Sequence, residues 1–154
     1  MTRRKKIALG ADSAGKPLMD VVAAWLETRD DVEIVNLSEP DSGDSELYAE
    51  MTGRVARRVV SGEFERGILM CGTGLGVCIS ANKVPGIRAA LVHDTYSAER
   101  ASLSNDAQII TLGARVVGPE LAKAIVGTWL AAEFDPASHS AANVAAIDAL
   151  DAGK

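Results

Sequence analysis

The stretch Gly67–Lys83, GILMCGTGLGVCISANK, decides the fold of this 154-residue chain. It begins with an apolar run typical of a buried strand and passes through a glycine-rich turn into a helix. A strand that feeds directly into a helix is the first half of a βαβ unit, and such units build parallel sheets. Cys71 stands at the turn, where the amino end of the following helix favours an anion. The segment therefore predicts a thiol suited to proton transfer beside a cradle for negative charge.

Three glycines, Gly72, Gly74 and Gly76, alternate through this turn. Because glycine has no Cβ, they let the backbone turn tightly and come close to a ligand. We expect their N–H groups to hold a developing oxyanion, for which each preorganised donor is worth roughly 3 kcal/mol. A turn that both moves protons and stabilises negative charge indicates catalysis as well as binding.

The rest of the chain repeats the alternation of strands and helices. Further short apolar runs lie at Ile7–Gly10, Glu33–Leu37, Ala89–His93 and Ile109–Leu112. Helical spacing of apolar residues occurs at Lys16–Glu27, Tyr48–Val60, Ser97–Ser102 and Glu120–Phe134. With right-handed crossovers, this order predicts an α/β fold: a Rossmann-like three-layer αβα sandwich around a five-stranded parallel sheet.

A last alanine-rich helical segment, Ser138–Asp151, follows Pro136 and has no evident partner in the sheet. We expect a C-terminal helical extension in which residues 136–154 pack on a second subunit. The length fits one domain, residues 1–154, and is short for two.

The composition is that of an ordinary globular protein, with 47% hydrophobic and 24% charged residues. A formal net charge of −5 makes nonspecific nucleic-acid binding unfavourable. No apolar run reaches the roughly 18 residues of a membrane span, and no signal-peptide pattern is present. Cys71 and Cys78 form no disulfide framework, so we expect reduced thiols in a cytoplasmic protein. His93 and His139 lie too far apart in the sequence to give a metal-ligand spacing.

Each predicted strand runs at its carboxyl end into a polar or glycine-containing loop. These loops begin near Asp12, Ser38, Cys71, His93 and Gly113. Ligands of open α/β sheets bind at that edge, so we place the active site there.

Six motifs then occur in order: Gly10-Ala-Asp12-Ser-Ala-Gly15, Cys71-Gly-Thr-Gly-Leu-Gly76, Ala81-Asn-Lys83, Pro85-Gly-Ile-Arg88, Ser104-Asn-Asp106 and Gly113-Ala-Arg-Val-Val-Gly118. Through this ordered set the chain resembles the type B ribose-5-phosphate isomerases and the related galactose-6-phosphate isomerases, from about Ile7 to about Leu150. The resemblance implies metal-free and cofactor-free aldose–ketose isomerisation of a phosphorylated sugar through an enediol(ate). It also implies a homodimer, or a dimer of dimers, whose active sites are shared between subunits.

The resemblance also implies roles for particular residues. One branch of the family uses the cysteine of the turn as the base and another a glutamate four residues later; this chain has Cys71 and Leu75, which match the cysteine branch. Thr73 matches a threonine that bonds a substrate oxygen, and it could equally cap the helix. The implied substrate-binding set is Asp12, Ser13, Gly72, Gly74, Leu75, Gly76, Asn105, Arg115 and His139. Arg115 corresponds to a phosphate-binding arginine, and Asp12 to a residue that contacts sugar hydroxyls or simply forms the turn.

The chain departs from the ribose isomerases at several of these positions. Serine replaces a histidine at Ser13 and again at Ser104, where the family histidine helps to open the furanose ring, and an aromatic residue is replaced around Ser45. In the tail, only His139 keeps a cationic option for the partner's phosphate.

These departures favour a substrate that needs no ring opening. A tetrose 4-phosphate carries phosphate on the oxygen that would close a furanose, so it stays open-chain. The stretch His93–Ala101 also resembles relatives that act on tetrose phosphates in erythritol-type catabolism. We therefore predict interconversion of D-erythrulose 4-phosphate and D-erythrose 4-phosphate, with ribose-5-phosphate isomerisation as the alternative.

Two readings from other classes stay open at this stage. A non-catalytic nucleotide- or sugar-phosphate-binding module could share the architecture, although the glycine spacing is that of neither a dinucleotide fingerprint nor a P-loop. The chain could also be a degenerate subunit that needs a paired paralogue, as in the two-component galactose-6-phosphate enzymes. The second acid/base group is likewise open, with Asp12 and His93 as candidates.

Overall fold

The computed structural model describes residues 3–152. Residues 1–2 and 153–154, at the ends of the expected 1–154 domain and 136–154 segment, lie outside the described residues. The strands are β1 (Lys5–Ala11), β2 (Val32–Asn36), β3 (Arg66–Cys71), β4 (Ala89–Leu91) and β5 (Ile109–Gly113). The helices are α1 (Lys16–Glu27), α2 (Tyr48–Val60), α3 (Leu75–Asn82), α4 (Thr95–Leu103), α5 (Pro119–Ala131) and α6 (Ala141–Ala149).

The five strands form one parallel sheet in the order β2-β1-β3-β5-β4, which confirms the predicted sheet. β4 is shorter than the predicted Ala89–His93. Its pairing with β5 continues one residue further through the Val92 N–H, which donates to the Thr111 carbonyl at 3.1 Å. Beyond that point a side chain takes over, because Nε2 of His93 accepts from the Gly113 N–H at 3.1 Å.

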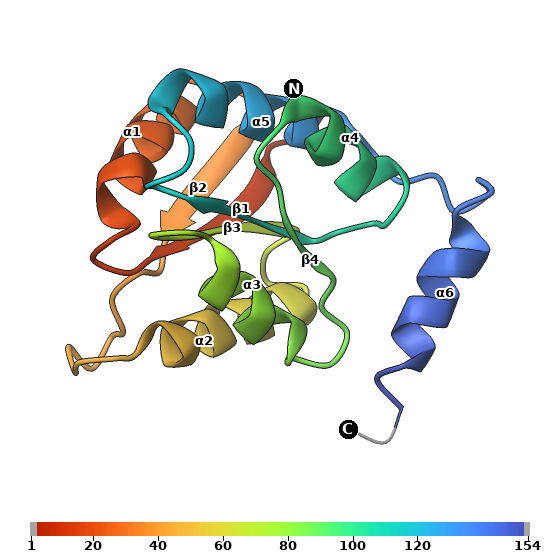
Figure 1. Cartoon of the computed structure of the whole chain (residues 1–154), viewed down its shortest axis with the longest axis horizontal. Coiled ribbons are helices and arrows are strands. Elements are labelled where there is room, and N and C mark those ends of the chain that lie inside the picture. The colour runs from red at the N-terminus through yellow and green to blue at the C-terminus, as the bar shows by residue number, and fades with distance from the viewer. Residues whose placement is uncertain (1–2, 153–154) are drawn as a thin grey trace.

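Helices cover both faces of the sheet, giving the predicted three layers (Figure 1). Buried residues of α1, α4 and α5 pack on one face around Trp129, which is fully buried. Residues of α2 and α3 pack on the other face with Phe64 and Leu69. No helix within residues 3–152 is both long and apolar enough to cross a bilayer.

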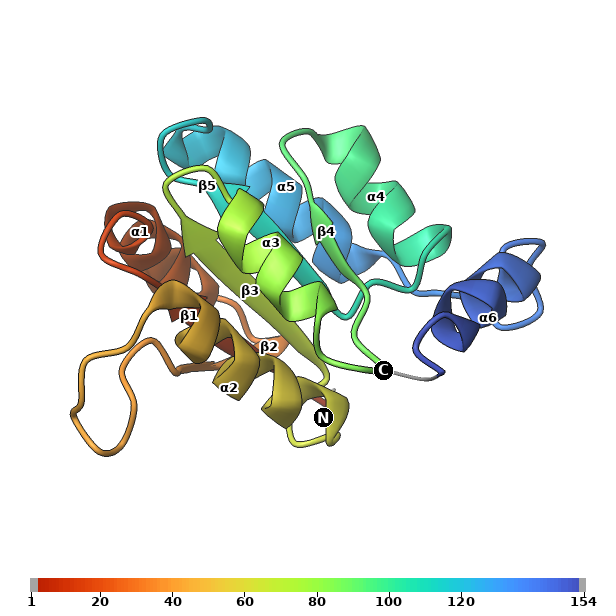
Figure 2. The same cartoon turned by 60° about the horizontal axis from the view of Figure 1, so that its bottom comes forward.

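Two neighbouring central strands send the helices that follow them to opposite faces of the sheet. β1 leads into α1 on one face, while its neighbour β3 leads into α3 on the other (Figure 1, Figure 2). In open α/β sheets, ligands bind at the carboxyl ends of the strands where the crossovers change face in this way. Asp12 and Cys71 stand at those two strand ends.

Helix α6 stands beside the sandwich, past the β4 edge of the sheet (Figure 1, Figure 2). It is attached through the segment before β4: Arg88 Nη1 donates to Asp148 Oδ1 at 2.7 Å, and the Gly86 N–H donates to Asp151 Oδ2 at 2.7 Å. Val144 is buried, but Leu150 is 75% exposed. The helical extension is thus present, held to its own chain by polar contacts and showing part of its apolar side to solvent.

Candidate active site

Cys71 is the last residue of β3, and its side chain is buried. The N–H of Gly74 donates to its Sγ at 3.1 Å. The Cys71 carbonyl is also held, because it accepts from the Ala114 N–H at 3.0 Å. The sulfur is therefore fixed in a shielded position, with a backbone donor aimed at it in a way that suits an anionic sulfur.

The glycine turn adopts the geometry that its sequence predicts. Gly74 caps α3 with φ of 79°, in the left-handed region. Oγ1 of Thr73 accepts from the N–H of Leu75, the first residue of α3, at 3.2 Å, but the N-cap position belongs to Gly74, so Thr73 is not the N-cap residue that the sequence allowed. Gly76, at the second position of α3, is among the amides for which helix geometry supplies no intrahelical acceptor. The Gly74 and Leu75 amides are engaged inside the turn, which leaves the Gly76 amide among those that can donate to a ligand oxyanion.

Asp12 lies directly beside this turn. Its N–H donates to the Met70 carbonyl at 3.3 Å, which joins the end of β1 to the residue before Cys71. Its Oδ1 accepts from the Gly15 N–H at 2.8 Å, so the turn-forming role weighed for Asp12 is present. A carboxylate has a second oxygen, and the residue is only half-buried. Asp12 can therefore form the turn and contact a ligand at the same time.

Strand β5 supports the turn from the other side. Oγ1 of the buried Thr111 donates to the Gly74 carbonyl at 2.8 Å. Nε2 of His93, an acceptor here, holds the Gly113 N–H at the strand's end. His93 is therefore engaged in positioning β5. Of the two candidates for the second acid/base group, Asp12 lies closer to Cys71, because β1 is next to β3 and β4 is not.

Arg115 follows β5, and its N–H donates to the Gly72 carbonyl at 2.9 Å. The guanidinium covers Gly72 so closely that a Cβ on that residue would lie 2.9 Å from Nη1. No carboxylate within residues 3–152 forms an ion pair with it. An exposed guanidinium beside the turn is suited to a phosphate.

A hollow of about 590 Å³ opens next to the turn, at the carboxyl ends of β1 and β2. Asp12 and Ser13, which directly follow β1, line it together with Ser45 and Tyr48. It also carries the carboxylates of Asp20, Glu39, Asp44 and Glu46 against the ammonium of Lys16. Arg54, bidentate on Glu46 at 3.0 and 2.8 Å, lowers the pKa of that carboxyl. This surplus of negative charge disfavours a phosphate in the hollow and leaves Arg115 as the cation suited to it.

Two residues of the expected site lie elsewhere. Asn105 precedes β5 and His139 follows α5. Both therefore lie toward the amino ends of the strands, whereas Cys71 lies at a carboxyl end. Cys71 pairs with the last residue of β5, and the first residue of that strand is four steps away, roughly 13 Å at 3.3 Å per step. Within one chain Asn105 is not brought to the thiol. The Ser104 hydroxyl, next to Asn105, accepts from Arg100 Nε at 2.8 Å, so Arg100 fixes its position.

Sequence reasoning missed Tyr48, whose ring lies against Gly76 across the space between α2 and α3. A weak signal was present, because a third glycine just inside a helix often marks a close approach by another group. Cys78, the second cysteine, is structural: its Sγ lies 3.7 Å from the Ala89 carbonyl, and burial raises the pKa of its thiol. Within residues 3–152, no group of three or more His, Cys, Asp or Glu side chains is arranged to hold a metal ion.

Comparison with known proteins places this geometry in context. Residues 7–147 match the family described as ribose/galactose isomerase. D-erythrulose-4-phosphate isomerase of Pectobacterium atrosepticum is 50% identical over 129 residues, 84% of each chain. D-erythrulose-4-phosphate isomerase 2 of Mycolicibacterium smegmatis is 47% identical over 149 residues, 95% of this chain and 97% of the relative. The structure of Clostridium thermocellum ribose-5-phosphate isomerase B superposes with a TM-score of 0.86 at 43% identity, covering 95% of this chain and 97% of that one.

Proposed function

The chain belongs to the ribose/galactose isomerase family, and from that premise we propose that it interconverts D-erythrulose 4-phosphate and D-erythrose 4-phosphate. The observation that carries the reaction class is the arrangement at the end of β3: a buried Cys71 sulfur that accepts from a backbone N–H, with Asp12 and Arg115 on either side of the turn. The two relatives with 50% and 47% identity carry the name of the tetrose enzyme, which supports the choice of substrate.

The proposed mechanism moves one proton between adjacent carbons. The Cys71 thiolate removes the proton from the carbon beside the carbonyl, which leaves an enediolate. The Gly76 amide and its neighbours in the turn stabilise the oxygen on which charge develops. The thiol then returns its proton to the neighbouring carbon, while Asp12 transfers the hydroxyl proton between the two oxygens. Arg115 pairs with the phosphate throughout.

The preference for a tetrose rests on the two serines. Ser13 is an exposed hydroxyl at the hollow, and Ser104 is bonded to Arg100. Neither is a proton donor of the kind that opening a furanose ring requires. A tetrose 4-phosphate has no such ring to open, because its terminal oxygen carries the phosphate. The site therefore suits an open-chain substrate.

The position of Asn105 and His139 extends the proposal to the assembly. If both contact substrate, they must do so in the site of a second copy of the chain. Exposed apolar side chains support such an interface: Leu75 and Ile79, one helical turn apart on α3, are 51% and 61% exposed. We propose a homodimer in which the segment after Pro136 lies against the partner.

The first test is turnover of the purified protein on D-erythrulose 4-phosphate and on ribose 5-phosphate under identical conditions. We expect kcat/KM to favour the tetrose strongly. A preference for ribose 5-phosphate would mean that another group opens the ring, and it would replace the tetrose assignment by the pentose one. Turnover of neither sugar by the homomer would contradict the proposal and favour a binding module or a subunit that needs a paralogue.

A further inference from the structure

Tyr48 lies between the glycine turn and the hollow and contacts both. It is the first residue of α2, and its side chain lines the hollow together with Asp12 and Ser13. Its ring also rests on Gly76, since a Cβ built on that glycine would lie 2.5 Å from Cζ and 2.6 Å from Oη of Tyr48. The contact requires glycine at position 76. The phenol is thereby held beside the Gly76 amide, one of the N–H groups that can donate to a ligand oxyanion.

The ring is not needed to hold α2 in place. The helix start is fixed by the Leu47 N–H, which donates to Glu50 Oε2 at 2.8 Å, and the helix is anchored by the buried side chains of Met51, Val55 and Val59. Tyr48 itself is 45% exposed, and its hydroxyl makes no hydrogen bond to any of residues 3–152. An aromatic side chain whose hydroxyl has no protein partner among residues 3–152, placed against a glycine at the mouth of a hollow, has the properties of a ligand contact.

We propose that Tyr48 is a substrate-contacting residue whose hydroxyl bonds a sugar oxygen and whose ring limits the length of the bound sugar. This inference rests on the proposed function and adds a specificity-determining residue to it. The ring stands between Gly76 and the hollow lined by Asp12 and Ser13. Removing the ring extends the hollow toward Gly76, whereas removing only the hydroxyl deletes the proposed hydrogen bond.

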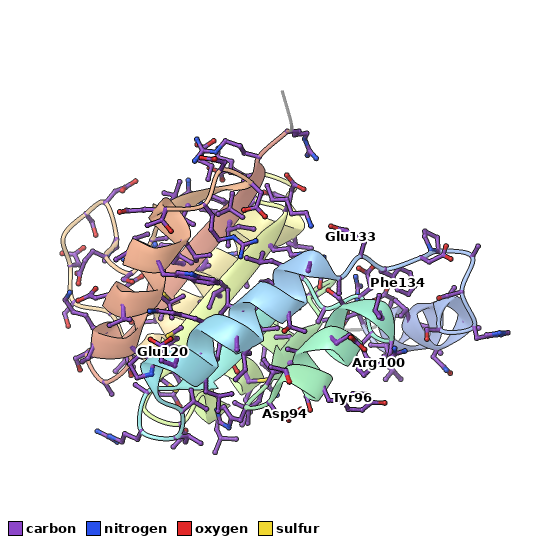
Figure 3. The ribbon with its side chains drawn as sticks, turned by 90° about the horizontal axis from the view of Figure 1, so that it is seen from above. Asp94, Tyr96, Arg100, Glu120, Glu133 and Phe134 are labelled. Atoms are coloured by element: carbon purple, nitrogen blue, oxygen red, sulfur yellow. The ribbon has the colours of Figure 1, made fainter. Side chains whose placement is uncertain are left out.

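The test measures binding as well as turnover, so that it does not depend on the chemical step. The probe is D-erythronate 4-phosphate, in which a carboxylate replaces the aldehyde, and its Kd is determined by calorimetry. We expect Tyr48→Phe to weaken binding by about five- to tenfold, the usual effect of losing one neutral hydrogen bond. The matched control is Tyr96→Phe on α4, which removes a hydroxyl from a tyrosine that is 72% exposed and projects away from the sheet (Figure 3).

A second variant tests the limit on length. The ratio of the Kd values for D-ribonate 5-phosphate and D-erythronate 4-phosphate is compared between the wild type and Tyr48→Ala. We expect the ratio to shift toward the longer ligand by about tenfold or more in Tyr48→Ala, and to change little in Tyr48→Phe.

The outcomes separate the inference from the proposed function. Weaker binding by Tyr48→Phe in a protein that turns over neither sugar would support the contact and overturn the isomerase assignment. Unchanged Kd values in both Tyr48 variants, with an active wild type, would overturn the contact alone. A wild type that does not bind the probe would overturn both.

Discussion

At the scale of single residues, the assignment of Cys71 as the base gives the most direct prediction. Cys71→Ala removes the group that carries the proton but leaves a small side chain in a buried position, so the fold should be retained. We expect kcat for D-erythrulose 4-phosphate to fall by about 10²- to 10⁴-fold or more, measured alongside circular dichroism. Cys78→Ala is the control, because that thiol faces the Ala89 carbonyl and should be dispensable. Near-normal turnover by Cys71→Ala would rule out its role.

A second residue-scale prediction concerns the turn that holds the thiol. At Gly74 φ is 79°, and a Cβ there would lie 2.7 Å from Leu91 Cδ1 and 2.8 Å from the Leu112 carbonyl carbon. Gly43 has a similar φ of 74° but nothing within 4 Å of such a Cβ. Gly74→Ala should therefore lower the free energy of unfolding by about 2 kcal/mol more than Gly43→Ala, in urea denaturation. Equal losses would mean that the turn relaxes without cost.

The residues that sequence predicted correctly as neighbours are those that end adjacent strands. Asp12 and Cys71 could be placed together because both follow apolar runs, and parallel strands bring such positions to one edge. The hydrogen bond from the Asp12 N–H to the Met70 carbonyl bears this out. The Tyr48–Gly76 contact could not be derived in this way. It joins α2 and α3, and their spacing depends on how the side chains of both helices pack on their face of the sheet.

At the scale of elements, the amphipathic helices were the most predictable. α1 and α2 have the predicted bounds, Lys16–Glu27 and Tyr48–Val60, because their buried faces repeat every three to four residues. The order of strands was beyond the sequence pattern: β5 inserts between β3 and β4, and that choice depends on long-range packing. The insertion matters for the site, since it brings Arg115 and Thr111 to the Cys71 turn.

The connection between β2 and α2, which forms the outer wall of the hollow, gives an element-scale prediction. It is tied down by the Glu46–Arg54 pair, whose side chains are 17% and 24% exposed. Arg54 lowers the pKa of Glu46 in the folded protein, so the pair's contribution is present above the unfolded pKa and is lost as pH falls through the folded one. Glu46→Gln should cost about 1 kcal/mol at pH 7.

The difference between wild type and Glu46→Gln should shrink as pH falls below about 4, measured by denaturant unfolding across that range. Asp20→Asn is the control, because its pair with Lys16 is exposed on both sides and should contribute little at any pH. A cost that stays constant with pH would show that the glutamate acts through packing and not through its charge.

At the scale of the whole molecule, the carboxyl ends and the amino ends of the strands carry different parts of the proposed site. At the carboxyl ends lie Cys71, Asp12 and Arg115, and at the amino end of β5 lies Asn105. The residue after Asn105 is held in place: Asp106 has φ of 46°, and Arg88 Nε donates to the Asp106 carbonyl at 2.9 Å. Burial raises the pKa of the Asp106 carboxyl, against the opposing effect of Arg88. Because Arg88 also donates to Asp148, the same side chain holds both Asp106, the neighbour of Asn105, and α6.

A site shared between two chains predicts that two inactive variants restore activity when they are combined in one dimer. Cys71→Ala and Asn105→Ala should each abolish most turnover as homodimers. In a hybrid dimer one site loses both residues, while the other combines the intact Cys71 of one chain with the intact Asn105 of its partner. An equal mixture that is unfolded and refolded together should regain about a quarter of wild-type activity, because half of the dimers are hybrids and each has one complete site.

Two differently tagged chains allow the hybrid to be purified and assayed by itself. If Asn105 served the Cys71 of its own chain, every site in the hybrid would be defective and no activity would return. Full activity of the Asn105→Ala homodimer would instead remove Asn105 from the site.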